Sequence, residues 1–494
     1  MENKIREYGH LHYPVTDKVN TENIKISSRM GLGMEKLDRD RFNPEKVYDW
    51  VKKSGVKWIR IQSGWAKTET VRGVYDFEWL DKIVDNLLAI GCTPWLCLCY
   101  GNYLYQEEGE NQDGGAFGLP PIHTEEQRTA WANYVSAVAT HYKGRLKYYE
   151  VWNEPDGPWC WQHGVDGYEY GAFARATGKA VKEADSDAKI ISGSFCLGYT
   201  MWLDRAFRAG MADYTDYISY HSYGYDIDVG IEKLVADIRT VIDRYDPTIK
   251  IVQGEVGCQS RPDGLGALAD GQWNETIQAK ALLRRLVSDI STEVEFTSWF
   301  STVDMLENAI DYDPACPEKN YGFFGVLREE LENGMPTSVY SPKPSYYALQ
   351  NLCKLFPDDA KVSPLSIQCD ADLQISLQER NLAPHVEVKT IGFKRDNGSS
   401  AYVFWKASDV RRMDYHGTMR VYISGIKGNL KLVDTLTGEI MDIPEKYYKN
   451  EILRMIDRYH IGISAEDTEK YGDRVIELPL TDYPLILTIG DYLD

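Results

Sequence analysis

Two glutamates each close an apolar run that is typical of a β-strand. Glu154 follows the run 147–153, and Glu255 stands near the end of the run 250–256. A pair of carboxyl groups can cleave a glycosidic bond when one protonates the leaving oxygen and the other attacks or supports the positively charged sugar carbon. A single glutamate in such a place is more often a solvated side chain. Two of them, three strands apart, favour a catalytic pair.

The strands that must bring these glutamates together form a regular series. Between residues 26 and 357, short apolar runs alternate with longer amphipathic stretches, which is typical of βα units around a parallel sheet. The predicted strands are 29–34, 56–62, 93–99, 147–153, 189–195, 216–222, 250–256 and 294–301. This series predicts a closed (β/α)8 barrel, in which functional side chains gather at the carboxyl ends of the strands.

The stretches between the strands carry helical periodicity. Apolar residues recur every three or four positions in 78–90, 125–142 and 275–290. Pro44 and Pro344 fit the first turn of a helix, because that turn has no use for the missing N–H. We therefore expect helices in these ranges and helix starts at both prolines.

The pattern changes to short alternating runs after residue 357. Predicted strands at 401–405, 420–423, 430–433 and 483–489 lie among turns such as Asn397-Gly398. The chain is therefore predicted to be an α/β protein with a catalytic barrel at 26–357 and an antiparallel, β-sandwich-like accessory domain at 362–494. Residues 1–25 could join the accessory domain, and no element is assigned to 444–474.

Composition excludes several classes of function. The 494 residues exceed what one core usually organises, and 55 basic against 75 acidic residues give a net charge of −20. Such a charge repels nucleic acid and anionic lipid. No apolar run approaches the length of a membrane span, and the N-terminal residues do not resemble an export signal. We expect a cytoplasmic protein whose nine cysteines are mainly buried thiols.

The segment around Glu154 resembles a known family. The motif Tyr-Glu-Val-Trp-Asn-Glu-Pro at 149–155, together with Glu255 on the seventh strand, is similar to clan A of the glycoside hydrolases, the retaining (β/α)8 enzymes. The variant Glu-Val-Trp-Asn-Glu-Pro is most similar to family 39, the β-xylosidase and α-L-iduronidase type. The resemblance implies that Glu154 is the general acid/base and Glu255 the nucleophile.

The same resemblance implies roles for residues on other strands. Asn153 would bind the sugar 2-hydroxyl, and Arg60 would steady the nucleophile. His221 and Tyr223 match a His and Tyr pair two residues apart, which the period of a strand places on one face. Trp299 matches a tryptophan that forms the floor of the sugar site. Each of these residues could instead be an ordinary core residue.

The expected charges of these groups fit a double displacement. Arg60 and the Tyr223 hydroxyl would keep Glu255 ionised, because a cation and a hydrogen-bond donor both favour the carboxylate. The charge of Glu255 would in turn raise the pKa of Glu154 and keep it protonated. Once a glycosyl-enzyme intermediate removes that charge, Glu154 could act as the base.

Two loops carry further candidates for sugar binding. Trp159 and Trp161 follow the acid/base candidate, and Tyr100 and Asn102 follow the third strand. Aromatic rings suit the apolar faces of sugars and amides suit their hydroxyls, although a rigid loop core would also explain the tryptophans.

We therefore expect a retaining glycosidase that acts from the chain end on β-linked oligosaccharides, similar to β-xylosidases or β-glucosidases. Exo action is expected because a cytoplasmic enzyme meets imported oligosaccharides. An endo-acting glycanase and a non-catalytic carbohydrate-binding barrel are the alternatives. No cofactor and no metal are expected, since His10-Leu-His12 lies outside the strand pattern and Gly31-Leu-Gly33 is too short for a dinucleotide site. The expected partner is a glycoside, and the oligomeric state is left open.

Overall fold

The chain forms two compact units. The computed structural model describes residues 4–106, 118–162, 164–307, 320–333, 335–371, 388–411, 414–448 and 473–494. One unit comprises Arg29–Glu275 and Leu286–Lys343, and the other comprises Met1–Ser28, Thr276–Arg285 and Pro344–Asp494. The domain boundaries given above from the sequence stay a prediction.

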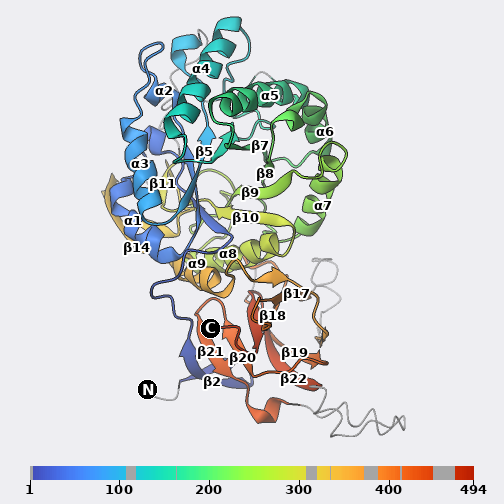
Figure 1. Ribbon diagram of the computed structural model, residues 1–494. Helices are drawn as coiled ribbons and strands as arrows, with labels where there is room; N and C mark the ends of the chain where they lie inside the picture. Colours follow the sequence, from blue (N-terminus) through green and yellow to red (C-terminus); the bar gives the residue numbers. More distant parts are fainter. Residues whose placement is uncertain are drawn as a thin grey trace. The chain divides into compact units, whose positions relative to one another are not determined.

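The first unit contains a closed parallel barrel, which confirms the predicted fold class. Its strands follow one another in the order β10-β3-β4-β5-β6-β7-β8-β9 (Figure 1). Their bounds are β3 Met30–Gly33, β4 Trp58–Gln62, β5 Thr93–Leu98, β6 Tyr148–Val151, β7 Lys189–Phe195, β8 Tyr217–His221, β9 Lys250–Val256 and β10 Val294–Trp299. Each predicted strand therefore exists, although most are shorter than the apolar runs that indicated them.

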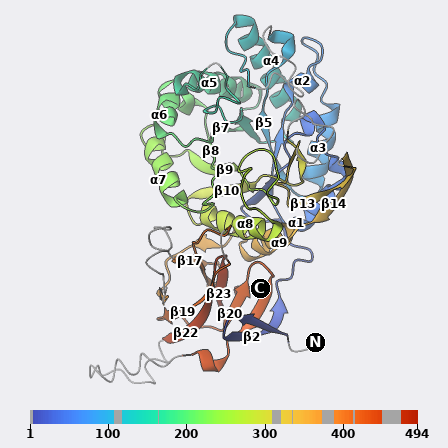
Figure 2. The ribbon, with the colours of Figure 1, turned by 180° about the vertical axis from the view of Figure 1, so that it is seen from behind.

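Helices connect these strands around the outside of the barrel, as the view from behind also shows (Figure 2). They are α1 Tyr48–Ser54, α2 Trp65–Thr68, α3 Glu78–Ala89, α4 Glu125–Tyr142, α5 Gly167–Ala184, α6 Thr200–Arg208, α7 Ile231–Ile242 and α8 Glu275–Ile290. The α4 helix starts where a capping box of Thr124 and Gln127 satisfies its first N–H groups. The predicted helices at 125–142 and 275–290 match α4 and α8, and α3 ends one residue before the predicted 78–90.

Short elements complete the first unit. In the described ranges of this unit, 3₁₀ turns lie at η1 Leu37–Arg39, η2 Pro44–Lys46, η3 Tyr103–Tyr105 and η4 Met211–Asp213. Two antiparallel pairs follow the barrel, β11 Met305–Leu306 with β12 Tyr321–Gly322 and β13 Leu327–Glu332 with β14 Met335–Pro342. Pro44 opens η2, a 3₁₀ turn, and Pro344 opens the α-helix α9 Pro344–Leu355 of the second unit.

Aromatic side chains fill the amino-terminal end of the barrel. Trp95, Ile191, Val252 and Phe296 form a buried cluster, and the Trp58 ring stacks on Phe296 at 4.0 Å between ring centroids. These residues come from five strands and all point inward. Because side chains alternate along a strand, residues two positions further on also point inward, one layer closer to the carboxyl ends. That next layer includes Arg60, two residues after Trp58, and Glu150 and Ser219, two residues after Tyr148 and Tyr217, which also pack against the cluster. The barrel therefore changes from apolar to polar within one step.

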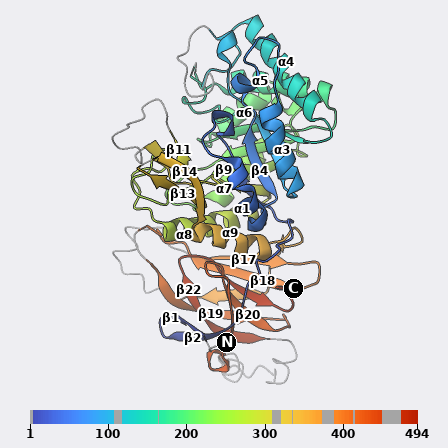
Figure 3. The same ribbon diagram turned by 90° about the vertical axis from the view of Figure 1, so that its left-hand side faces the viewer.

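The second unit is built on antiparallel sheets, as predicted (Figure 3). Eight strands pair in the order β1-β2-β21-β20-β23-β18-β17-β15, and three more form β16-β19-β22. Their bounds are β1 Ile5–Tyr8, β2 Leu11–Lys18, β15 Lys361–Val362, β16 Ile367–Asp370, β17 Val388–Lys394, β18 Ser400–Lys406, β19 His416–Ile423, β20 Leu430–Asp434, β21 Glu439–Asp442, β22 Arg474–Thr481 and β23 Leu485–Ile489. The N-terminal strand β2 pairs with β21, so the ends of the chain share one sheet.

Other sequence expectations concern cysteines, histidines and membranes. The eight cysteines in the described ranges are free thiols, six of them buried, and Cys316 lies outside those ranges. His10 and His12 lie on the β1–β2 hairpin, near Glu477 and Glu7 respectively. None of the helices described by the structure is both long and apolar enough to cross a lipid bilayer.

The aromatic cluster generates a test of barrel stability. Phe296→Ala removes a ring that is 1% exposed and stacks on Trp58, so we expect the free energy of unfolding to fall by about 3–5 kcal/mol. Urea unfolding followed by tryptophan fluorescence measures the change. Met201→Ala, at a side chain that is 64% exposed on α6, is the matched control and should change stability little. Equal effects of the two substitutions would show that the cluster does not support the barrel.

Candidate active site

The loop that follows β6 holds Glu154 in an unusual backbone conformation. Trp152 and Glu154 have φ values of 66° and 45°, in the left-handed region that residues other than glycine rarely adopt. Such conformations persist only where surrounding contacts impose them, and they concentrate at functional sites. Here the Glu154 N–H donates to the Ser194 carbonyl at 3.0 Å, which fixes the loop against the end of β7.

A buried aspartate adds a second connection between these loops. The Asp156 carboxylate accepts hydrogen bonds from the backbone N–H groups of Cys196 at 2.9 Å and Leu197 at 2.7 Å. Asp156 is 1% exposed. The position of the loop at Glu154 therefore depends on its own backbone N–H and on Asp156 two residues later.

Glu255 is held by donors on both of its oxygens. Arg60 Nη1 donates to Oε2 at 2.6 Å, and the Tyr223 hydroxyl donates to Oε1 at 2.8 Å. The Glu255 side chain is 13% exposed, so it reaches solvent or a ligand while both oxygens are oriented. Burial, followed by the charge of Glu255, raises the pKa of Tyr223 well above its usual range, which keeps its hydroxyl a donor.

Arg60 contacts several acceptors at once. Its guanidinium is fully buried and contacts three carboxyl groups through Nε and Nη1. The acceptors are Glu150 (from Nε, 2.6 Å), Glu255 and Glu35 (from Nη1, 2.6 and 3.3 Å), and Asn153 Oδ1 and Cys97 Sγ (from Nη2, 2.8 and 3.6 Å). A guanidinium has five N–H groups, so each has an acceptor. The ends of four barrel strands are thereby tied to one cation.

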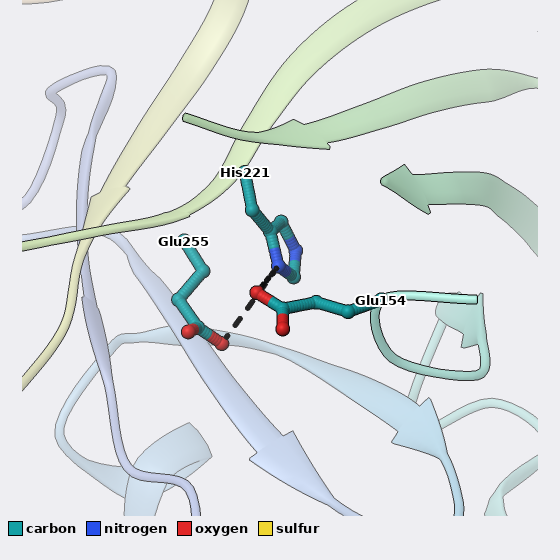
Figure 4. Close-up of side chains that lie close together, drawn as sticks. All are labelled: Glu154, His221 and Glu255. Carbon is teal, nitrogen blue, oxygen red and sulfur yellow. Dashed lines mark hydrogen bonds and ion pairs between the residues drawn. The ribbon is translucent and has the colours of Figure 1, made fainter. Parts of the chain in front are cut away.

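His221 lies close to the carboxylates of Glu150, Glu154 and Glu255. Figure 4 shows it with Glu154 and Glu255. Its Nδ1 is 3.2 Å from Glu154 Oε1 and 4.0 Å from Glu255 Oε2, and its Nε2 is 3.8 Å from Glu150 Oε1. Gly254 makes this arrangement possible, because a Cβ at that position would lie 2.3 Å from Ser219 Oγ and 3.0 Å from His221 Nε2.

The imidazole of His221 is protonated at neutral pH. Burial lowers its pKa, but the nearby carboxylates of Glu150 and Glu154 outweigh burial and raise the pKa to about 9. Glu154, His221 and Glu255 thus form a closely grouped network of ion pairs around the imidazole.

The same histidine reverses the expected shift at Glu154. Burial raises the pKa of Glu154, but hydrogen bonds from His221 and from Trp159 Nε1, at 2.5 Å, hold it below its usual range. The expectation that the charge of Glu255 would raise this pKa in the free protein is therefore wrong. A positive charge and a donor at hydrogen-bond distance outweigh a carboxylate further away.

The carboxyl groups of Glu154 and Glu255 face each other (Figure 4). One ligand atom each from Glu154, His221 and Glu255 lies within 4.8 Å of the other two. Both glutamate side chains keep 12–13% of their surface exposed. The two groups named first from the sequence are thus brought together at the carboxyl ends of the barrel strands.

The predicted aromatic residues fall into two groups. Trp159 is 46% exposed and lies against Glu154 through its N–H. Trp161 and Trp299 have no exposed surface, and their N–H groups donate to Glu169 at 2.8 Å and to the Phe324 carbonyl at 3.3 Å. Trp159 can touch a ligand in the free form, whereas sugar contacts of Trp161 and Trp299 stay a prediction.

Tyr100 and Asn102 are engaged within the protein. Tyr100 is 5% exposed, and its hydroxyl accepts from Gln62 at 3.3 Å. The Asn102 side chain accepts from Leu104 N at 2.9 Å and donates to the Glu69 carbonyl at 2.8 Å, so it caps η3. Their proposed sugar contacts stay a prediction.

Sequence reasoning did not select Glu150 or Glu35 as site residues. Glu150 is completely buried on β6 and also accepts from Ser194 Oγ at 2.7 Å. Burial opposes its ionisation, but Arg60 and His221 hold the pKa of Glu150 well below its usual range. A charged residue in the middle of an apolar strand, on the same inward-facing period as Tyr148, was the available signal. Glu35 follows β3 with no such pattern.

The closed parallel barrel with additional antiparallel sheets has the architecture of clan A glycoside hydrolases. A sequence model of glycosyl hydrolases family 39 matches residues 42–361, and the chain belongs to this family. Two solved structures share the fold. A family 39 glycoside hydrolase from Bacteroides cellulosilyticus WH2 has a TM-score of 0.65 at 19% identity and covers 97% of this chain and 84% of that one. The GH39 enzyme from Xanthomonas axonopodis pv. citri has a TM-score of 0.58 at 16% identity and covers 96% and 95%.

Characterised relatives match shorter regions. A β-xylosidase of Geobacillus stearothermophilus is 22% identical over 213 residues, which cover 40% of this chain and 41% of that protein. The β-galactosidase BgaA of Clostridium cellulovorans is 28% identical over 147 residues, which cover 27% and 22%. The match thus spans less than half the length of these relatives.

The raised pKa of His221 predicts a pH dependence of stability. Between the ordinary histidine pKa of about 6.5 and about 9, the folded protein holds a proton that the unfolded chain has released. The stabilisation is therefore complete below about pH 6.5 and is lost as the pH rises through about 9. Urea unfolding of the wild type and His221→Gln should show a difference that shrinks by about 2–3 kcal/mol from pH 6 to pH 9.5. A constant difference over this range would mean that His221 is neutral in the folded protein.

Proposed function

We propose that the protein is a retaining glycoside hydrolase that acts on β-glycosides by double displacement. The observation that carries the proposal is the placement of Glu154 and Glu255, since one carboxyl oxygen of each lies within 4.8 Å of one carboxyl oxygen of the other. In retaining glycosidases the carboxyl groups are about 5–5.5 Å apart, whereas inverting enzymes need about 6.5–9.5 Å to admit a water. Membership of family 39 supports the same reaction class.

Glu255 is the nucleophile in this mechanism. Its Oε2 accepts from Arg60 and its Oε1 from Tyr223, so the carboxylate is held in one orientation before substrate arrives. Attack on the anomeric carbon forms a bond from a Glu255 oxygen while the bond to the leaving oxygen breaks. Asn153, whose Oδ1 accepts from Arg60, presents its amide to the sugar 2-hydroxyl, a contact that strengthens at the transition state.

Glu154 gives its proton to the leaving oxygen. In the free site His221 and Trp159 favour its carboxylate form, so substrate binding has to shift the balance. Trp159 is half-exposed, and a bound glycoside can displace its N–H from Glu154 and exclude water from the carboxyl group. Both changes raise the pKa of Glu154 toward that of an acid catalyst. In the second half of the reaction Glu154 takes a proton from water, which attacks the anomeric carbon and releases Glu255.

The proposed substrates are short β-linked oligosaccharides cleaved from the chain end. The relatives named above support this class because one is a β-xylosidase and the other a β-galactosidase. Release of single sugars is the product pattern of exo action, and a mixture of shorter oligosaccharides would identify an endo-acting glycanase. A barrel that only binds sugars would release no product from any aryl β-glycoside.

Glu255→Ala tests the nucleophile. We expect a loss of turnover by a factor of at least about 10⁴, because no group remains to form the covalent intermediate. Azide should restore part of the activity on aryl β-glycosides and give a glycosyl azide of the opposite anomeric configuration, which NMR identifies. Glu295→Ala, at an exposed glutamate on β10, is the control and should keep full activity. A glycosyl azide with the configuration of the substrate would show that the roles are misassigned.

Glu154→Ala tests the acid. Substrates with poor leaving groups need protonation, so kcat/KM for a 4-methoxyphenyl β-glycoside should fall about 10²–10⁴-fold. The corresponding 2,4-dinitrophenyl glycoside leaves without a proton, and its rate of glycosylation should change much less. Steady-state and burst kinetics on the two substrates measure these effects, with exposed Glu183→Ala as the control. Equal losses on both substrates would exclude Glu154 as the acid.

A further inference from the structure

A third carboxyl group lies on the guanidinium that holds Glu255. Glu35 follows β3 and is 2% exposed. Its Oε1 accepts from Arg60 Nη1 at 3.3 Å, and the same nitrogen donates to Glu255 Oε2 at 2.6 Å. Two carboxyl groups therefore share one nitrogen, and the shorter contact goes to Glu255.

The Glu35 carboxyl occupies space that a glycine leaves open. A Cβ on Gly33 would lie 2.1 Å from Glu35 Oε2 and 2.6 Å from Oε1. Gly33 does not have a positive φ, so alanine could adopt its backbone conformation. The alanine methyl group would, however, overlap the Glu35 carboxyl. Among the described residues, Glu35 Oε2 has no hydrogen-bond partner, and it is shielded from water. The carboxyl group is thus enclosed by the fold, with one oxygen on Arg60 and the other unpaired.

The surroundings of Glu35 make it unfavourable for this residue to ionise beside the carboxylate of Glu255. Arg60 on β4, Glu255 on β9 and Tyr223 after β8 face it, and the adjacent Lys36 pairs with Glu307 at 2.7 Å. Burial raises the pKa of Glu35 to about 7, with Arg60 opposing the rise and the charge of Glu255 adding to it. A buried carboxyl group with an unpaired oxygen is more stable when protonated.

We propose that Glu35 is a positioning residue for the nucleophile: as a neutral acid it leaves the Nη1 charge of Arg60 to Glu255, and as an anion it competes for that nitrogen. The proposal rests on the proposed function, because the role of Glu255 as nucleophile belongs to it. Ionisation of Glu35 weakens the hydrogen bond that orients Glu255. Attack by Glu255 is therefore fastest while Glu35 keeps its proton.

A trapping reaction isolates this step. The probe is a 2,4-dinitrophenyl 2-deoxy-2-fluoro-β-D-xyloside, or the galactoside if the wild type prefers galactosides. A Glu255 oxygen bonds to the anomeric carbon, the bond to dinitrophenolate breaks, and the anion leaves without a proton from Glu154. The wild-type rate of dinitrophenolate release should fall about tenfold from pH 6 to pH 8 as Glu35 ionises. Glu35→Gln, which stays neutral, should keep its pH 6 rate over the whole range.

Two further variants separate this role from a merely structural one. Gly33→Ala places a methyl group where the Glu35 carboxyl lies. We expect it to displace that carboxyl from Arg60 Nη1, so the rate of this variant should also be flat from pH 6 to pH 8. Glu329→Gln changes a buried glutamate on β13 that accepts from Ser338 N, and it should show the wild-type fall. A fall caused by His221 or Lys36 would remain in Glu35→Gln, because both residues are still present.

The outcomes distinguish the two proposals. An equal fall in the wild type and Glu35→Gln, or a flat wild-type profile, overturns the role of Glu35. If Glu35→Gln does not fold, a wild-type fall in Gly33→Ala overturns it equally. Absence of a covalent adduct on Glu255 in the wild type, measured by mass spectrometry of peptides, overturns the proposed double displacement instead.

Discussion

A buried guanidinium is stable in a protein only if its N–H groups find acceptors and its charge finds carboxylates. In this barrel Arg60 meets both conditions with residues from several strands, among them Glu150 on β6 and Glu255 on β9. Removing any of these partners would leave charge unpaired in a dry interior. The catalytic end of the barrel is therefore organised around one cation, and the orientation of Glu255 follows from it.

The packing of the barrel fixes the position of Arg60 along the barrel axis. The amino-terminal layer of Trp58, Trp95 and Phe296 is apolar and packed ring against ring. One step along the strands, the same inward period carries Arg60 and Glu150, so the polar layer stands on a rigid floor. Gly33 and Gly254 add the room that Glu35 and His221 need, since a Cβ at either position would collide with those side chains. The placement of the charged groups therefore depends on the missing side chains at Gly33 and Gly254 as well as on the charged residues themselves.

The four carboxyl groups of the site differ in how readily each one holds a proton. Glu35, Glu150, Glu154 and Glu255 face Arg60 and a protonated His221. Glu150, with both cations near it, is held ionised, whereas Glu35, enclosed and with an unpaired oxygen, has its pKa raised to about 7. Glu154 lies nearest to His221 and is therefore more acidic in the free protein than a general acid should be. In the proposed mechanism, substrate binding therefore has a chemical task besides positioning, which is to return a proton to Glu154.

Local pattern in the sequence was sufficient for the barrel and for the two glutamates. Alternating apolar and amphipathic runs predicted all eight barrel strands, because a parallel strand buried on both faces must be continuously apolar. Glu154 and Glu255 stood out because Glu154 follows such a run and Glu255 stands near the end of another. The tertiary structure decided what depends on distance between strands: the five acceptors of Arg60, the burial of Trp161 and Trp299, the inclusion of Glu35, and the direction of the pKa shift at Glu154. Electrostatic interaction and burial vary over a few ångströms, and separation along the chain does not encode such distances.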